Sequence, residues 1–293
     1  MYVIMGASGH IGSRLAATLL EKGQAVRVVG RSRDRLQNLV SLGAEAAIGD
    51  QLDRDFLRTA FAGAKGVFVL IPPNFAVADF RAWQRQAADT LVEALKGSAV
   101  KRVVSLSSAG ADRPSGTGPI VGLYHMEQGL NSLPGIELTH LRAGYFMENT
   151  FNSIGLIKQA GIMASIGSPD EIQTLIATRD IADAAAEELL AERSVDGRVR
   201  YLLGARDYTQ SEVATILGKA IGKPELTYVQ VDEATVRGGM EGAGLTADMA
   251  GLYLEMLGAI SKGELNLPAR DARNTTPTTL EDFAPVFAAA YNA

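Results

Sequence analysis

The stretch that decides the fold is Gly6-Ala7-Ser8-Gly9-His10-Ile11-Gly12, which follows an apolar run at residues 2–5 and opens a helical pattern over residues 11–22. Glycine permits a tight turn and a close backbone approach to a ligand. The free N–H groups at the start of the next helix bind phosphate charge. Because the motif lies between a strand pattern and a helix pattern, it predicts a dinucleotide diphosphate held by Gly6, Ser8, Gly9, His10, Ile11 and Gly12. A tight turn that binds nothing is the alternative.

The first half of the chain repeats this rhythm of strand and helix. Apolar, strand-like runs cover residues 25–29, 44–48, 67–71, 102–106 and 137–141, with helical patterns between them. Such alternation is typical of parallel βαβ units, whose right-handed crossovers give a doubly wound sheet. The sequence therefore predicts an α/β fold with a parallel Rossmann sheet and a ligand at the carboxyl ends of its strands.

The second half is less regular. Strand-like runs at 174–177, 198–203 and 226–231 accompany helical patterns, and Thr209 to Glu212 form a capping-box pattern. We expect residues 1–150 to form the dinucleotide-binding domain and residues 151–293 a smaller, mixed α/β region on the substrate side. The segment 174–205 is expected to return to the first domain.

Composition excludes several classes of function. The 293 residues carry a net charge of -5, so no basic surface for nucleic acid is expected. The absence of cysteine excludes disulfides, thiol nucleophiles and cysteine-ligated metals, and the three histidines are far apart, so no metal site is expected. No apolar run is long enough to span a membrane and no targeting pattern is visible, so we expect a cytoplasmic protein, monomeric or homodimeric.

The end of the second predicted strand indicates which dinucleotide binds. An acidic residue there would hydrogen-bond the ribose 2′-hydroxyl of NAD, whereas arginine suits the 2′-phosphate of NADP. The chain has Gly30-Arg31-Ser32-Arg33 and no carboxylate before Asp34. Arg31, supported by Ser32 and Arg33, therefore predicts NADP(H); a solvated basic turn is the alternative.

The glycine spacing resembles the atypical short-chain dehydrogenases/reductases, and further segments narrow this to the NmrA-like family, which includes quinone reductases and redox-sensing regulators. The matching segments are Gly6–Gly12, Gly49-Asp50, Ser105–Gly110, Leu141–Asn149 and Ala177–Ala182. They end near residue 205, so the resemblance is specific for fold and cofactor and weaker for the substrate.

The resemblance implies several roles beyond the glycine motif. Asp50 would lie near the adenine, Ile71 and Pro72 would border the cofactor, and Ser107 and Ser108 would lie on the nicotinamide side. The backbone at Ala143–Phe146, including Gly144, would pass along the nicotinamide, with Tyr145 and Asn149 facing the substrate. For Phe146, core packing is the alternative.

The Tyr-x-x-x-Lys pair that most short-chain reductases use is missing from this chain. Alignment on residues 123–130 puts Val121 at the tyrosine position and His125 at the lysine position. The missing pair disfavours epimerase, dehydratase and ordinary ketone-reductase chemistry, which need a strong positioned acid or base. His125 is the candidate for ribose contact or proton relay, with an exposed helical histidine as the alternative.

Quinone reduction tolerates this loss, because the hydroquinone anion is far less basic than an alkoxide and accepts a proton from water or histidine. The leading hypothesis is an NADPH-dependent oxidoreductase that transfers hydride to a small aromatic or quinone-like acceptor, with His125, Tyr145 and Asn149 as catalytic candidates. The alternative is a non-catalytic NADP(H)-binding redox sensor. An isoflavone-type reductase is disfavoured, because such relatives use a lysine near position 125.

Overall fold

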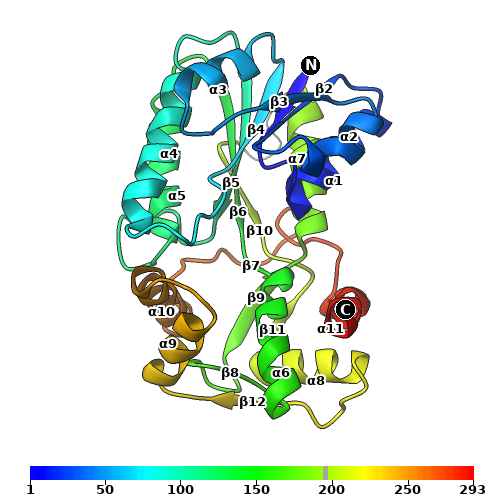
Figure 1. Cartoon of the computed structure of the whole chain (residues 1–293), viewed down its shortest axis with the longest axis vertical. Helices are drawn as coiled ribbons and strands as arrows, with labels where there is room; N and C mark the ends of the chain where they lie inside the picture. Colours follow the sequence, from blue (N-terminus) through cyan, green and yellow to red (C-terminus); the bar gives the residue numbers. More distant parts are fainter. Residues whose placement is uncertain (194–196) are drawn as a thin grey trace.

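The computed structural model describes residues 1–193 and 197–293, and it has a large parallel sheet at one end and two small sheets at the other (Figure 1). The large sheet has the order β10-β6-β5-β4-β1-β2-β3, and all its paired strands are parallel. Its strands are β1 (Tyr2–Ile4), β2 (Val26–Gly30), β3 (Glu45–Ile48), β4 (Gly66–Val69), β5 (Arg102–Ser108), β6 (Glu137–Ala143) and β10 (Val199–Leu202). The expected doubly wound Rossmann sheet is confirmed.

Helices cover both faces of this sheet (Figure 1). One face packs on α1 (His10–Glu21), α2 (Gln37–Ser41) and α7 (Thr178–Leu190), and the other on α3 (Arg54–Phe61), α4 (Phe80–Leu95) and α5 (Ile120–Asn131). Successive strand residues point to opposite faces, so Ile4 joins the first core and Val3 the second. Burial on both faces explains why these strands are continuous apolar runs.

The smaller region is built around a three-stranded sheet in the order β11-β9-β7 and a two-stranded sheet of β12 and β8. These strands are β7 (Tyr145–Phe146), β8 (Ile162–Ser165), β9 (Ile172–Ile176), β11 (Asp207–Thr209) and β12 (Thr227–Gln230). Its helices are η2 (Met147–Ser153), α6 (Ile154–Ala160), α8 (Gln210–Ala220) and α11 (Leu280–Asn292). The rings of Phe151, Phe283 and Phe287 stack within this core, with centroids 5.7 and 6.2 Å apart.

The segment 174–205 divides between the two parts of the molecule. Helix α7 packs on α1, and β10 pairs in parallel with β6 at the edge of the large sheet. Strand β9, in contrast, pairs with β7 and β11 in the small sheet. The chain therefore crosses from the small region to the large sheet after Ile176.

Local sequence signals explain most of the helix ends. The Asp53 carboxylate accepts hydrogen bonds from the backbone N–H groups of Asp55 and Phe56 and so caps α3. Thr209 and Glu212 form the expected capping box at the start of α8. The helical pattern at 34–42 instead splits into a 3-10 turn, η1 (Asp34–Leu36), followed by α2.

Two further helices, α9 (Glu233–Gly242) and α10 (Ala247–Ser261), pack on each other beside the ends of α4 and α5 (Figure 1). Helix α10 is the more apolar of the two and buries six residues, whereas α9 buries none. Among the described residues, no helix is both long and apolar enough to cross a membrane.

Candidate functional site

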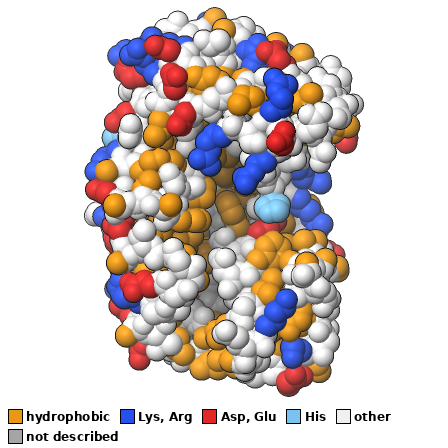
Figure 2. All heavy atoms as spheres, viewed as in Figure 1, with side chains coloured by type: hydrophobic (Ala, Val, Ile, Leu, Met, Phe, Trp, Pro, Cys, Tyr) orange, Lys and Arg blue, Asp and Glu red, His pale blue; other side chains and the backbone are white. Residues whose placement is uncertain are grey.

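A cleft of about 830 Å³ runs along the carboxyl ends of the large sheet's strands. Residues from the ends of β1, β2, β5 and β6 line it, together with side chains from α4, α5 and α10. Figure 2 shows a hollow across this face, with hydrophobic side chains inside it and several Lys or Arg side chains along its upper margin. This is the position at which open parallel sheets bind ligands, and we call it the main cleft.

The glycine turn forms one end of the main cleft. Gly6 has a φ of +64°, and its carbonyl accepts a hydrogen bond of 2.9 Å from the N–H of Gly9. A Cβ at Gly12 would lie 2.4 Å from the Gly6 oxygen, so only glycine lets α1 approach the turn this closely. In the described chain no side chain caps α1 at Gly9, which leaves its first N–H groups for a ligand.

Basic side chains follow β2 at the same end. Arg31 and Arg35 line the main cleft, whereas Ser32 and Arg33, which were expected to support Arg31, do not. The one-turn helix η1 explains this exchange, because it carries Arg35 back toward the cleft and leaves Arg33 at the helix start.

Asp50 does not line the main cleft either. Its carboxylate accepts a hydrogen bond of 3.0 Å from the N–H of Leu52, and its carbonyl accepts one from the N–H of Asp53. Asp50 therefore stabilises the turn before α3, and the neighbouring Gln51 lines the cleft in its place.

Four aromatic side chains line the other end of the cleft: Phe75, Phe80, Trp83 and Tyr253. The centroid of the Phe80 ring lies 6.2 Å from that of Phe75 and 5.9 Å from that of Trp83, and both pairs are stacked. Tyr253 of α10 lies 6.4 Å from Phe75. Aromatic surfaces of this kind favour the binding of flat aromatic molecules.

Helix α10 is held over this aromatic end by two polar contacts with α4. The Asp248 carboxylate accepts a hydrogen bond of 2.9 Å from the backbone N–H of Phe80 at the start of α4. The guanidinium of Arg81 donates one of 2.8 Å to Glu255. Tyr253 lies between these two acceptors in the sequence, and Met256 follows the second. The two contacts therefore hold both side chains in place as part of the cleft wall.

A buried polar network supports the strand ends at the middle of the cleft. Ser107 at the end of β5 donates a hydrogen bond of 2.5 Å to Glu127 of α5, which is 1% exposed. Arg142 of β6 donates two more to the same carboxylate and one of 3.0 Å to the hydroxyl of Tyr201. Burial disfavours the charged guanidinium, but these hydrogen bonds outweigh it and raise the pKa of Arg142.

Tyr145 and Asn149 both line the centre of the cleft. Burial raises the pKa of the Tyr145 phenol, the nearby Tyr253 adds to the increase, and the polar side chain of Asn149 offsets part of it. Glu148, between them in sequence, accepts hydrogen bonds from the N–H and hydroxyl of Thr178 and so caps α7. This cap fixes the backbone that carries Tyr145 and Asn149.

His125 does not reach the main cleft. Its Nε2 lies 2.7 Å from a carboxylate oxygen of Asp89 on α4, and its side chain is 42% exposed. The side chains that α5 presents to the cleft are Ile120 and Leu123, and Val121 also lies outside it. The geometry therefore places His125 outside the main cleft and beside Asp89, and its role in ribose contact or proton relay stays a prediction that this position does not favour.

The structure brings most of the sequence-predicted residues together. Those that line the main cleft are Gly6, Ser8, Gly9, His10, Ile11, Gly12, Arg31, Ile71, Pro72, Ser107, Ser108, Gly144, Tyr145, Phe146 and Asn149. Sequence reasoning missed Arg35, Gln51 and the residues of the aromatic end. Arg35 was visible as a third arginine after β2, whereas no sequence signal connects α10 with α4.

The residues present fit a dinucleotide. The cleft joins a glycine cradle that a single Cβ would fill, a helix start without a side-chain cap, and two arginines beyond β2. Glu148, already occupied by Thr178, is the one carboxylate among the described residues that line it. Phosphate charge is therefore met by positive groups at this end.

Comparison with known proteins agrees with this geometry. The model of the NmrA-like family matches residues 2–283. The chain belongs to the NmrA-like family. Two curated relatives are an NAD(P)H azoreductase of Xenophilus azovorans, 27% identical over the whole of both chains, and quinone oxidoreductase 2 of Escherichia coli, 27% identical over 90% of each.

Solved structures of known reductases share the fold. The structure of the Escherichia coli NADPH-dependent quinone oxidoreductase in complex with NADPH has a TM-score of 0.78 at 24% identity, covering 97% of this chain and 98% of that one. At this identity the likeness establishes the fold alone. Because it covers 97% of this chain, it includes the region of the small sheets.

Proposed function

We propose that the protein is an NADPH-dependent oxidoreductase that reduces a quinone-like, planar aromatic acceptor. The observation that carries the proposal is the composition of the main cleft, which has a phosphate-binding glycine turn at one end and an aromatic wall at the other. The curated relatives named for NAD(P)H-dependent azo reduction and for quinone reduction support the same class of reaction.

The residues of the chain would hold the coenzyme along the strand ends. The glycine turn and the N-terminus of α1 would bind the diphosphate, and Arg31 with Arg35 would bind the 2′-phosphate. Ser107, Ser108 and the backbone from Gly144 to Phe146 would border the nicotinamide. The buried Glu127–Arg142 network stabilises the positions of β5 and β6 beneath it.

When bound, NADPH supplies a hydride to the quinone, which also gains one proton from water and becomes a hydroquinone while NADPH becomes NADP⁺. Tyr145, Tyr253 and the aromatic end would hold the acceptor ring against the coenzyme, so positioning is the chief contribution of the protein. Among the described residues that line the cleft there is no lysine to lower the pKa of a tyrosine. This arrangement suits an acceptor whose reduced anion is weakly basic.

The aromatic end favours an enzyme over a redox sensor, because coenzyme binding alone requires no wall of Phe75, Trp83 and Tyr253 beyond the nicotinamide side. The test is the oxidation of NADPH, followed by its absorbance, with menadione or benzoquinone as acceptor. Turnover supports the proposal. Tight NADPH binding in calorimetry together with no turnover of any quinone would refute it and favour the sensor.

A further inference from the structure

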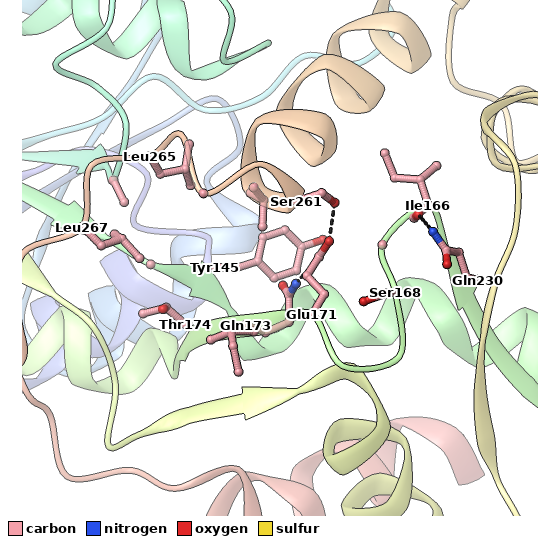
Figure 3. A pocket seen from close by; sticks show the side chains of 16 residues that line it. Tyr145, Ile166, Ser168, Glu171, Gln173, Thr174, Gln230, Ser261, Leu265 and Leu267 are labelled. Carbon is pink, nitrogen blue, oxygen red and sulfur yellow. Dashed lines mark hydrogen bonds between the residues drawn. The ribbon is translucent and has the colours of Figure 1, made fainter.

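A second cavity of about 630 Å³ adjoins the main cleft, and we call it the Glu171 pocket (Figure 3). The loop at residues 166–171, strand β9 and the carboxyl end of α10 line it. Five residues line both cavities: Ala109, Gly144, Tyr145, Ile260 and Leu265. The Tyr145 ring therefore stands between the two, and a molecule held against it in the main cleft has the Glu171 pocket on its other side.

Glu171 is the only charged residue among the described residues that line this pocket. Its carboxylate accepts a hydrogen bond of 2.6 Å from the side-chain amide of Gln173 and another from the hydroxyl of Ser261 (Figure 3). Both donors are neutral, and no Lys, Arg or His in the described part of the chain forms an ion pair with it. The negative charge of the carboxylate is thus held in place without a cationic partner.

The end of α10 strengthens the negative character of the pocket, and a contact with Gly167 positions the carboxylate. Helix α10 ends at Ser261, and Ile260, Ser261 and Gly263 line the pocket, so the partial negative charge of a helix C-terminus faces it. The carboxylate also packs closely on Gly167, where a Cβ would lie 2.3 Å from Oε2 of Glu171. This contact fixes the position of the carboxylate relative to the loop at residues 166–171.

The remaining walls combine apolar and neutral polar side chains. Ile166, Leu265 and Leu267 form part of the apolar wall, and Ser168, Thr174 and Gln230 add neutral polar groups (Figure 3). A pocket whose one charged group is a half-buried carboxylate suits a short aliphatic or aromatic group that ends in an ammonium, since partial burial strengthens the attraction between opposite charges.

We propose that the Glu171 pocket binds the positively charged substituent of the acceptor, so that the protein prefers cationic planar acceptors over neutral and anionic ones. The proposal rests on the proposed function for its acceptor site, and it adds the charge of the substrate class. Glu171 acts in it through binding only, and the reduction itself is unchanged.

The test uses three naphthoquinones that share one short aliphatic tether ending in a trimethylammonium, a methyl or a sulfonate group. The value of kcat/KM is measured for each with the wild-type protein and with Glu171→Gln, which keeps hydrogen-bonding atoms for Ser261 and Gln173. The ratio of cationic to anionic kcat/KM is expected to fall about tenfold in the variant. Glu21→Gln, which removes an exposed carboxylate at the end of α1, is the matched control and should leave the ratio unchanged.

A second measurement needs no turnover. Calorimetry of the protein with NADP⁺ should detect naphthylmethylammonium binding, at least about tenfold tighter than naphthalenesulfonate, and the preference should be lost in Glu171→Gln. Turnover of the neutral quinone without any preference for the cation overturns this inference alone. Absence of turnover with all three quinones refutes the proposed function, while the calorimetric preference still decides the charge of the pocket.

Discussion

Arg142 of β6 and Glu127 of α5 form a buried ion pair, with Nη2 of Arg142 2.6 Å from Oε2 of Glu127. Ser107 donates a further hydrogen bond to Oε1 of the same carboxylate. The pair thus joins the ends of β5 and β6 to α5, directly behind the middle of the main cleft. An acid and a base in the core of this sheet stabilise its geometry only while both are present.

Removal of one partner should therefore unfold the protein more easily. Glu127→Ala leaves the Arg142 guanidinium buried without its carboxylate, and we expect the free energy of unfolding to fall by about 3–5 kcal/mol. Glu93→Ala, which removes an exposed partner of Lys96, should cost no more than about 1 kcal/mol. Urea denaturation of both variants measures the difference, and equal losses would contradict the assigned role of the network.

The glycine turn gives a second prediction. In Gly12→Ala the new Cβ meets the backbone of Gly6 and Ala7, which a side-chain rotation cannot relieve, so α1 has to move from the turn. The affinity for NADPH should fall by at least about 1.4 kcal/mol, which is tenfold. Gly155→Ala on α6 is the control, because a Cβ there meets no atom within 4 Å. Calorimetric titration with NADPH distinguishes the two, and equal affinities would exclude the turn as the phosphate site.

Stability should depend on pH through His140, which is fully buried in β6 with its Nδ1 2.6 Å from the hydroxyl of Ser105. Burial lowers its pKa from 6.5 to about 4, and the charges of Arg142 and Arg198 contribute to the decrease. The unfolded chain binds this proton more readily than the folded one, so the contribution is complete above pH 6.5 and is lost as the pH falls toward 4. We expect a loss of about 2 kcal/mol at pH 5.

Urea denaturation at pH 7 and pH 5 checks this expectation. His140→Gln keeps a hydrogen-bonding group for Ser105 but does not titrate, so its stability should change less between the two pH values by about the same 2 kcal/mol. If the wild type and the variant lose stability in parallel, other groups carry the dependence.

The fold could be predicted largely from the sequence because its signals are local. A glycine turn after an apolar strand, repeated strand and helix patterns and the Asp53 cap each involve neighbouring residues. The aromatic end could not be found in this way, because Tyr253 meets Phe75 only after α10 has packed on α4. That contact depends on the tertiary fold and leaves no periodic pattern.

The position of His125 outside the main cleft has a geometric cause. The alignment on residues 123–130 puts the lysine position at His125 on α5. An alignment does not show which face of the helix points toward the cleft. Each residue turns the helix by about 100°, so His125 points about 200° away from Leu123, which faces the cleft. Arg35 was missed for the related reason that the one-turn helix η1 decides which of the three arginines after β2 lines the cleft.

Coenzyme selectivity should depend on Arg31 and Arg35 and not on Arg33. The first two line the main cleft where the 2′-phosphate would lie, whereas Arg33 does not line it. Arg31→Ala and Arg35→Ala should each weaken NADPH binding about tenfold, or 1.4 kcal/mol, and leave NADH binding nearly unchanged. Arg33→Ala, with the same loss of charge, should change either affinity by no more than about 0.5 kcal/mol. An equal effect of all three would indicate a general attraction of charge.

The role of Tyr145 separates quinone reduction from chemistry that needs a positioned acid. Its pKa is raised by burial, so the phenol stays protonated from about pH 6 to about pH 9 and adds no basic limb to the pH profile of kcat/KM. If it orients the acceptor, Tyr145→Phe keeps the ring and should lower kcat/KM for menadione by less than about tenfold. An essential proton donor would instead cost about 10²–10⁴-fold. Asn149→Ala, which removes the polar side chain beside the hydroxyl and leaves the ring, should have an effect of similar size to that of Tyr145→Phe. A loss of the larger size in Tyr145→Phe, restored with an acceptor that needs no proton, would make Tyr145 the acid and overturn the positioning role.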